Sequence, residues 1–193
     1  AVTDAFTTDF QYKHAWASWL TSEEYRLASA SEEHPDTRTD RQMTPFQIST
    51  SLEALTGFKW TEQDRDLMDV DFRTMAGGID GYQTFERQHF PNLSSTLVLQ
   101  RLVQSSVSFA LTYPEDAPLL SQVPLNSTPD SDFAQDFLSK IRLIAHGKSA
   151  DSDWMEDTTL LWYQVLEASR GDFTTAWEVT LTAILQDADF VRY

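Results

Sequence analysis

One segment of the chain, from Asp69 to Asn92, combines acidic side chains with three of the six glycines. Its carboxylates are oxygen ligands of the kind that Ca²⁺ binds, and glycine lets a backbone turn closely around such an ion. The candidate ligands are Asp69, Asp71, Asp80 and Glu86. Their spacing departs from that of a calcium loop, because the first two acids lie too far from the glycines and Glu86 falls outside the expected register.

Two other interpretations of this segment stay open. In the first, it is an ordered surface loop whose acids cap neighbouring helices or pair with Arg73 and Arg87. In the second, it docks on a partner protein, since aromatic side chains are favoured anchors at protein interfaces. The aromatic residues of the segment are Phe72, Tyr82, Phe85 and Phe90, of which Tyr82 and Phe85 are our candidate partner contacts.

No other set of residues has the spacing of a catalytic site. The four histidines are His14, His34, His89 and His146, and no pair has the i, i+4 spacing of a helical metal site. Only His89 is a candidate ligand or base; His146 lies at a predicted helix end, where the helix dipole favours a cation. The chain has neither a nucleophile elbow nor a Walker loop. We predict no catalytic residue, which favours a protein that is not an enzyme.

The charge and the cysteine content exclude further classes of function. The formal net charge is -16, from 30 acidic and 14 basic residues, so nucleic acid and anionic lipid are unfavourable partners. The charge suits a cationic partner or a divalent cation, or it serves only to keep the protein dissolved. The absence of cysteine removes disulfides, thiolate metal sites and covalent attachment of a c-type haem. We therefore predict no cofactor other than calcium.

The N-terminal residues 1–43 are predicted to form an arm and a linker. The aromatic residues of the arm, which partly fit a helical stripe, are Phe6, Phe10, Tyr12, Trp16 and Trp19. They pack either on the chain's own domain or on a partner protein, for which they are our candidate contacts. The stretch Ser29 to Met43 is polar and charged, which is typical of a linker or an exposed loop.

The remaining residues, 44–193, carry a succession of helix start and stop residues. Thr44 and Gln47 make a capping box around Pro45, and Gly57 is a stop. A second helix start is predicted at Thr61 to Asp64, because acids there suit the helix dipole. Further helices are predicted from Asn92 to Thr112, from Asp130 or Ser131 to Gly147, from about Asp153 to Gly171, and from Asp172 onward. Leu93 and Leu97 are among the residues predicted to be buried.

These elements predict an all-α fold, a helical bundle of about five or six helices with an extended or helical aromatic arm and a long Gly-rich loop. No convincing alternating strand is present. The most apolar stretch, Leu93 to Leu111, is interrupted by polar residues, so we predict no transmembrane segment. The chain begins at Ala1 and not at a methionine, which fits either a mature form after removal of a signal peptide or a trimmed form of the protein.

The C-terminal pattern Ala176-Trp177, Leu181, Ile184-Leu185 and Phe190 resembles the end of a helical domain in large secreted bacterial proteins of planctomycete type, whose function is unknown. The helix Thr44 to Gly57 and the GGIDGY loop before Pro91 are also similar to that family. Its domains are often found beside c-type cytochrome domains. The resemblance implies an exported protein near redox machinery, but not that this chain carries electrons.

The leading hypothesis is a non-catalytic periplasmic or extracellular accessory subunit that docks on a larger assembly. The resemblance implies a membrane electron-transfer complex with a cytochrome subunit as that assembly. One alternative is a secreted hydrolase or glycan-binding module that uses the carboxylates and tryptophans, although Trp162 and Trp177 are assigned to the core. The other alternative is a calcium-stabilised structural domain.

Overall fold

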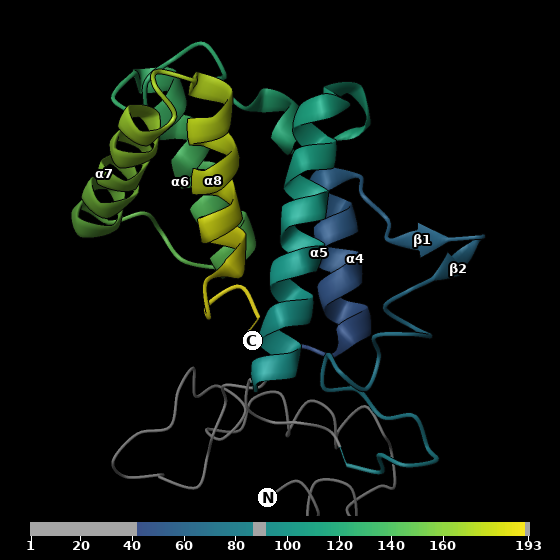
Figure 1. The fold of residues 1–193 in the computed structure, drawn as a ribbon. Coiled ribbons are helices and arrows are strands. Elements are labelled where there is room, and N and C mark those ends of the chain that lie inside the picture. The colour runs from purple at the N-terminus through teal and green to yellow at the C-terminus, as the bar shows by residue number, and fades with distance from the viewer. Residues whose placement is uncertain (1–41, 87–91, 192–193) are drawn as a thin grey trace, which may run out of the picture. The chain divides into compact units, whose positions relative to one another are not determined.

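Five α-helices and one β-hairpin make up residues 42–86 and 92–191, the part of the chain that the computed structural model describes (Figure 1). The elements, labelled as in Figure 1, are α4 (Pro45–Thr56), β1 (Thr61–Glu62), β2 (Arg65–Asp66), α5 (Leu93–Thr112), α6 (Asp132–His146), α7 (Ser152–Ala168) and α8 (Phe173–Gln186). Two 3-10 turns, Pro114–Asp116 and Leu120–Gln122, lie between α5 and α6. The predicted all-α fold is confirmed.

Helix α4 begins and ends where its sequence predicts. Thr44 Oγ1 accepts a hydrogen bond from the Gln47 backbone N–H at 3.1 Å, and Gln47 Oε1 accepts one from the Thr44 N–H at 2.8 Å. This is the predicted capping box. Gly57 ends the helix with φ +73°, and a Cβ at this position would lie 2.0 Å from the carbonyl oxygen of Asp116. Glycine is therefore required both by the turn and by the close approach of the backbone after α5.

The other helices also begin at the expected caps. Asn92 caps α5, with its side chain accepting from Ser95, and α5 ends at Tyr113, before Pro114. Ser131 caps α6, and Gly147 ends it at φ +65°. Asp151, rather than Asp153, caps α7, whereas Asp172 caps α8 as predicted. These ends depend on side chains adjacent in sequence, which is why local patterns locate them.

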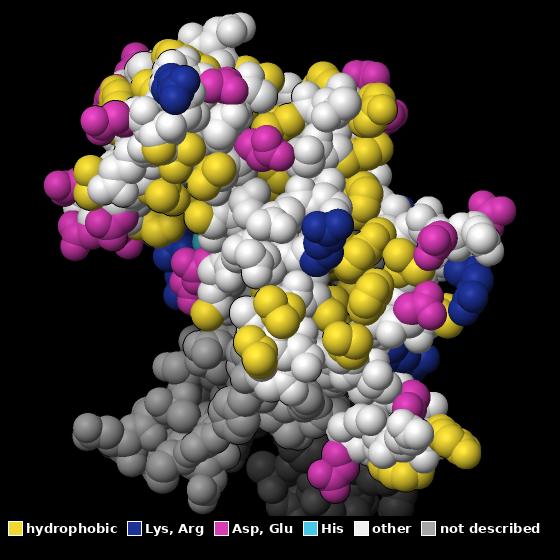
Figure 2. All heavy atoms as spheres, viewed as in Figure 1, with side chains coloured by type: hydrophobic (Ala, Val, Ile, Leu, Met, Phe, Trp, Pro, Cys, Tyr) yellow, Lys and Arg dark blue, Asp and Glu magenta, His cyan; other side chains and the backbone are white. Residues whose placement is uncertain are grey.

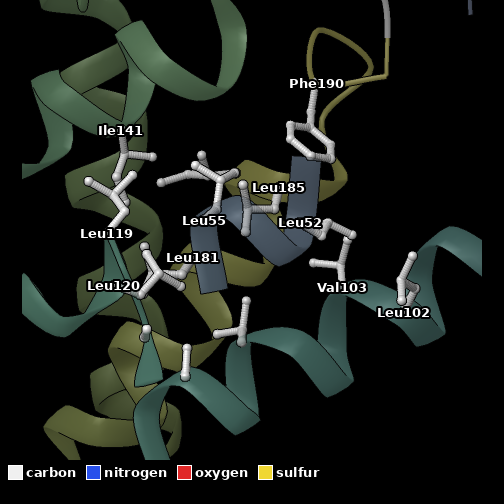
Figure 3. Packing of buried hydrophobic residues seen from close by; sticks show 14 of the residues in the cluster. Leu52, Leu55, Leu102, Val103, Leu119, Leu120, Ile141, Leu181, Leu185 and Phe190 are labelled. Carbon is white, nitrogen blue, oxygen red and sulfur yellow. The ribbon is translucent and has the colours of Figure 1, made fainter. Parts of the chain in front are cut away.

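The core is built from one face of each helix and from the loop after α5. Figure 3 shows side chains of α4 and α8 close to Val103 of α5, to Ile141 of α6 and to residues of that loop: Leu52, Leu55, Leu119, Leu120, Leu181 and Leu185. An aromatic cluster joins α7 to α8, where Trp162 lies 5.8 Å from Trp177 and 5.2 Å from Phe173 between ring centroids. Both tryptophans are fully buried, as the sequence predicts. Burial of each large apolar side chain contributes about 1.5–3 kcal/mol.

The predicted helix start at Thr61 to Asp64 is wrong. These residues form the β-hairpin instead, with Thr61 opposite Asp66 and Glu62 opposite Arg65. Gln63 and Asp64 make the two-residue turn at φ 51° and 62°, left-handed values that a helix cannot contain. The stretch lacks a repeating apolar stripe that would hold a helix against the core. Acidic residues at its start therefore do not suffice to make it helical.

The predicted burial of Leu93 and Leu97 is also wrong. Leu93 is 76% exposed and Leu97 is 53% exposed. The buried residues of α5, among them Val98 and Leu102, lie on the opposite side of the helix. Both sides of α5 carry leucines, so the apolar pattern alone does not show which side faces the core.

Candidate functional site

An open groove, here called the α5 groove, runs between α5 and the segment from Trp60 to Met75. Its cavity volume is about 710 Å³, and its lining residues are Trp60, Glu62, Arg65, Leu67, Asp71, Phe72, Met75, Leu97, Val98 and Arg101. Figure 2 shows hydrophobic side chains gathered over α5 and beside it, toward the hairpin. The groove thus lies on the face of α5 that the leucine pattern had assigned to the core.

The apolar floor of the groove is held in place by two stacked aromatic rings. Trp60 and Phe72 lie 4.9 Å apart between centroids with an interplanar angle of 14°. Both are partly buried and pack against the core. The carbonyl of Trp60 accepts a hydrogen bond from the backbone N–H of Leu67 at 2.9 Å, which joins the two ends of the hairpin. The floor is therefore preformed rather than assembled from mobile side chains.

Two large apolar side chains remain exposed at the mouth of the groove. Leu97, on the α5 wall, is 53% exposed, and Met75, on the opposite wall, is 46% exposed. Leu93 lies one turn before Leu97 on α5 and is still more exposed. Exposed apolar side chains gathered beside an apolar groove are typical of a binding surface, whereas single ones have no such meaning.

The charged side chains that line the groove are balanced, with Glu62 and Asp71 against Arg65 and Arg101. Two further carboxylates of this segment, Asp66 and Asp69, line a different pocket beside α4, where Asp69 pairs with Arg73 at 3.4 Å. Over the described residues as a whole, 22 Asp and Glu stand against 8 Lys and Arg.

A second, smaller pocket lies where the same segment folds back on α4. Its volume is about 240 Å³, and its lining includes Phe46, Met68 and Ile79. Phe46 is 73% exposed. A Cβ on Gly78 would lie 2.8 Å from the Arg73 carbonyl oxygen, so this glycine permits the close turn. The pocket extends the apolar surface along the segment from Trp60 to Ile79.

The predicted calcium ligands are all described, and the structure gives them separate surroundings. Asp69 pairs with Arg73, whereas Asp71 lines the α5 groove. Asp80 Oδ1 accepts hydrogen bonds from the backbone N–H groups of residues 82, 83 and 84 at 2.8–2.9 Å, which lower the pKa of its carboxyl. Glu86 is exposed. In the described ranges, no three or more His, Asp or Glu side chains form a group suited to a metal ion.

The predicted partner contacts divide into two sets. Tyr82 and Phe85 are 82% and 71% exposed, as a contact residue must be, but neither lines the α5 groove. The aromatic residues of the arm, Phe6, Phe10, Tyr12, Trp16 and Trp19, lie outside the described residues, as does His89. Met43, placed in the linker by its sequence, donates its backbone N–H to the Val191 carbonyl at 2.7 Å.

Sequence reasoning missed most of the α5 groove. Phe72 was recognised as an aromatic residue of the loop, whereas Leu97 was assigned to the core and Trp60 and Met75 were not singled out. A pattern that could have indicated the groove is the spacing of Leu93, Leu97 and Arg101 at successive i, i+4 positions. That row ends in an arginine, which favours a solvent-facing side of the helix.

A second polar cluster links the ends of α6 and α8. His146 accepts a hydrogen bond from Arg142 at Nδ1 and donates from Nε2 to the Ile184 carbonyl at 2.9 Å. Burial lowers the pKa of His146, so the dipole-stabilised cation expected from its place at the helix end is not what the structure favours. Asp189 lies 3.4 Å from Arg142 and 2.7 Å from Lys148. These contacts give the cluster a structural role.

Comparison with known proteins adds nothing to this geometry. No protein family, curated protein or solved structure matches the chain. The resemblance to the planctomycete-type domain therefore stays a prediction. None of the helices in the described residues is long and apolar enough to cross a membrane. The α5 groove is therefore the feature from which a function can be inferred.

Proposed function

We propose that this protein is a non-catalytic docking module that binds a partner protein through the α5 groove, as an accessory subunit of a larger assembly. The observation that carries the proposal is the pairing of a preformed aromatic floor, Trp60 on Phe72, with two exposed apolar side chains, Leu97 and Met75, at its mouth. Such a surface gains free energy when a partner covers it.

The residue types of the groove suit protein binding. Tryptophan is enriched among the residues that contribute most to protein interfaces, and methionine adapts its shape to the partner surface. Apolar area removed from water contributes about 25 cal/mol per Å² before the costs of association are subtracted. The ten lining residues supply several such side chains in one continuous surface.

The polar residues of the groove support binding rather than catalysis. Its charged lining residues, Glu62, Arg65, Asp71 and Arg101, are all exposed. General acid–base chemistry at neutral pH usually depends on groups whose pKa is shifted by burial or by a close charge. A rim of solvated charges around an apolar centre is instead the usual arrangement of an interface.

The resemblance described above supplies the proposed setting, a periplasmic or extracellular position beside a membrane electron-transfer complex with a cytochrome subunit. This part of the proposal rests on the resemblance alone. It predicts that a partner captured from native membranes carries the absorption bands of a c-type haem. A captured partner without haem would remove the cytochrome from the proposal and leave the docking function in place.

A pair of matched variants tests the docking function. Leu97→Asp places a charge in the α5 groove, whereas Leu160→Asp places one on α7 at a leucine of similar exposure, 55% against 53%. With immobilised full-length chain, we expect native extract to yield a stoichiometric partner on the wild type and on Leu160→Asp but not on Leu97→Asp. Recovery of no stoichiometric partner, or equal capture by all three baits, would overturn the proposal.

A further inference from the structure

We infer that a small cavity beside α4 and α5 is the site of one bound water molecule, which donates a hydrogen bond to the side-chain oxygen of Gln42. The cavity adjoins the α5 groove, since Val98 lines both. The water site does not depend on the proposed docking function. Its evidence is a buried polar atom that needs a partner, the size of the cavity and the chemistry of the lining residues.

Gln42 is a buried polar residue with an unpaired acceptor. It is 7% exposed, and in the part of the chain that the structure describes its Oε1 has no hydrogen-bond partner. An unpaired buried amide oxygen destabilises a fold, and buried polar groups that lack a protein partner usually bind an ordered water. The Met43 backbone N–H donates to the Val191 carbonyl oxygen at 2.7 Å, which holds Gln42 beside Val191. Both residues line the cavity, so it offers space for the missing partner.

The size of the cavity suits water and excludes an organic ligand. Its volume is about 30 Å³, and a cavity needs about 10–15 Å³ to hold one water molecule. Sites for small organic molecules are larger by a factor of ten or more, at about 300–1,000 Å³. The occupant is therefore restricted to water or to an ion of similar size.

The residues around the cavity are unsuited to an ion. None of the described residues that line it carries a charge, and most are apolar: Ile48, Met68, Ala76, Val98, Leu99 and Val191. An ion in such surroundings would lose its hydration without gaining a counter-ion, which costs far more free energy than the transfer of a neutral polar molecule. A neutral occupant is therefore favoured.

The polar side chains of the lining require an occupant that donates hydrogen bonds. Besides Gln42, they are those of Ser95 and Thr96 on α5. Both hydroxyl hydrogens are already donated to the Asn92 carbonyl oxygen, at 3.0 and 2.8 Å. Each hydroxyl can therefore offer an occupant only a lone pair, as Gln42 Oε1 does. Water has two donor hydrogens, so its chemistry matches a cavity lined by acceptors.

Nuclear Overhauser effects between water and methyl hydrogens test the site in the free full-length chain. We expect the methyl groups of Ala76 and Val191, which line the cavity, to show effects with the sign of a long-lived bound water. Gln42→Met keeps the length of the side chain and removes the oxygen, so these effects should be lost. The hydroxyl groups of Ser95 and Thr96 remain in that variant. Effects that persist in it would arise from exchange of hydroxyl hydrogens and would overturn the inference.

The same substitution at a second glutamine is the matched control. Gln122 Oε1 accepts a hydrogen bond from Lys140 at 2.9 Å, and Gln122 does not line the cavity. We expect Gln122→Met to leave the water signals unchanged, with both variants checked for folding by circular dichroism. A high-resolution crystal structure of the wild type should show one water within hydrogen-bond distance of Gln42 Oε1. Equal loss of signal in the two variants, a metal ion at the site or a cavity without density would contradict the inference.

Discussion

The imidazole of His146 donates its Nε2 hydrogen to the carbonyl oxygen of Ile184 at 2.9 Å, which joins the end of α6 to the last turn of α8. Its other nitrogen accepts from the Arg142 guanidinium, so only the neutral ring makes both contacts. The charged groups around it are Arg142 on α6, and Asp187 and Asp189 after α8. Because protonation of the ring would break one of these contacts, the stability of the packing between α6 and α8 depends on pH.

This relationship predicts a loss of stability on mild acidification. Because burial lowers the pKa of His146 below the ordinary value of 6.5, the unfolded chain takes up the proton first. The contribution of the neutral His146 ring to the free energy of unfolding is therefore present above pH 6.5 and is lost as the pH falls through the lowered pKa. Urea denaturation between pH 5 and 8 should show a smaller slope against pH for His146→Gln than for wild type. Equal slopes would contradict the proposed role of the imidazole.

Asp189 should contribute to the free energy of unfolding over a second, lower pH range that can be measured separately. Its hydrogen bond with Lys148 lowers the pKa of its carboxyl below 3.8, so its contribution is present above that pH and is lost on stronger acidification. Asp189→Asn should therefore change the pH dependence of unfolding near and below pH 4, and leave the His146 window above pH 5 in place. If Asp189→Asn changed the pH dependence of unfolding only above pH 5, the assignment of the two pH ranges to His146 and Asp189 would be wrong.

Gly57→Ala should be strongly destabilising, by more than about 2 kcal/mol, because a left-handed backbone and a steric conflict act together. The new Cβ would lie 2.0 Å from the Asp116 carbonyl oxygen, a backbone atom that cannot rotate away. Gly147→Ala is the matched control, since Gly147 has φ +65° with open space around it. It should cost only about 1 kcal/mol. Equal losses in chemical denaturation would contradict the close approach at Gly57.

The hairpin turn should accept a stabilising double substitution. Gln63 and Asp64 both have positive φ, a conformation that asparagine and glycine adopt more readily. Gln63→Asn with Asp64→Gly should therefore stabilise the hairpin by about 0.5–1 kcal/mol. Amide hydrogen exchange at residues 61–66 would show slower opening of this element. Faster exchange in the double variant would mean that the turn differs from the one described.

Calcium should leave the melting temperature unchanged, because the four candidate carboxylates do not form a ligand group. Asp80 instead holds its own loop through three backbone N–H groups. We expect Asp80→Ala to increase exchange of the amides of residues 82–84, and Asp80→Asn, which keeps an acceptor oxygen, to increase it less. A rise in melting temperature with Ca²⁺ that Asp80→Asn abolishes would restore the calcium site.

Local chemistry explains what could be predicted from the sequence. The ends of α4, α6 and α8 follow from side chains within a few residues of each end, such as Thr44, Gly147 and Asp172. The hairpin could not be predicted in the same way, because Gln63 and Asp64 lack the asparagine and glycine that usually mark such a turn.

The candidate site required the tertiary structure. Leu97 has the residue type of a core position, and only the packing of Val98 and Leu102 on the opposite side shows that it faces outward. Trp60 and Phe72 are separated by 12 residues, and their stacking depends on the hairpin between them. A docking loop was among the interpretations of the acidic segment from Asp69 to Asn92. The apolar floor of the α5 groove is nevertheless formed by Trp60 and Phe72, and not by the predicted contacts Tyr82 and Phe85.

Hydrogen–deuterium exchange on the complex of the full-length chain with its captured partner tests docking through the α5 groove most directly. We predict slower exchange at residues 60–75 and in the first half of α5, with no change in α7, where Leu160 serves as the reference surface. The same complex formed with Leu160→Asp should show the same protection. Protection confined to α7 or to other helices, with the groove amides unchanged, would contradict the account.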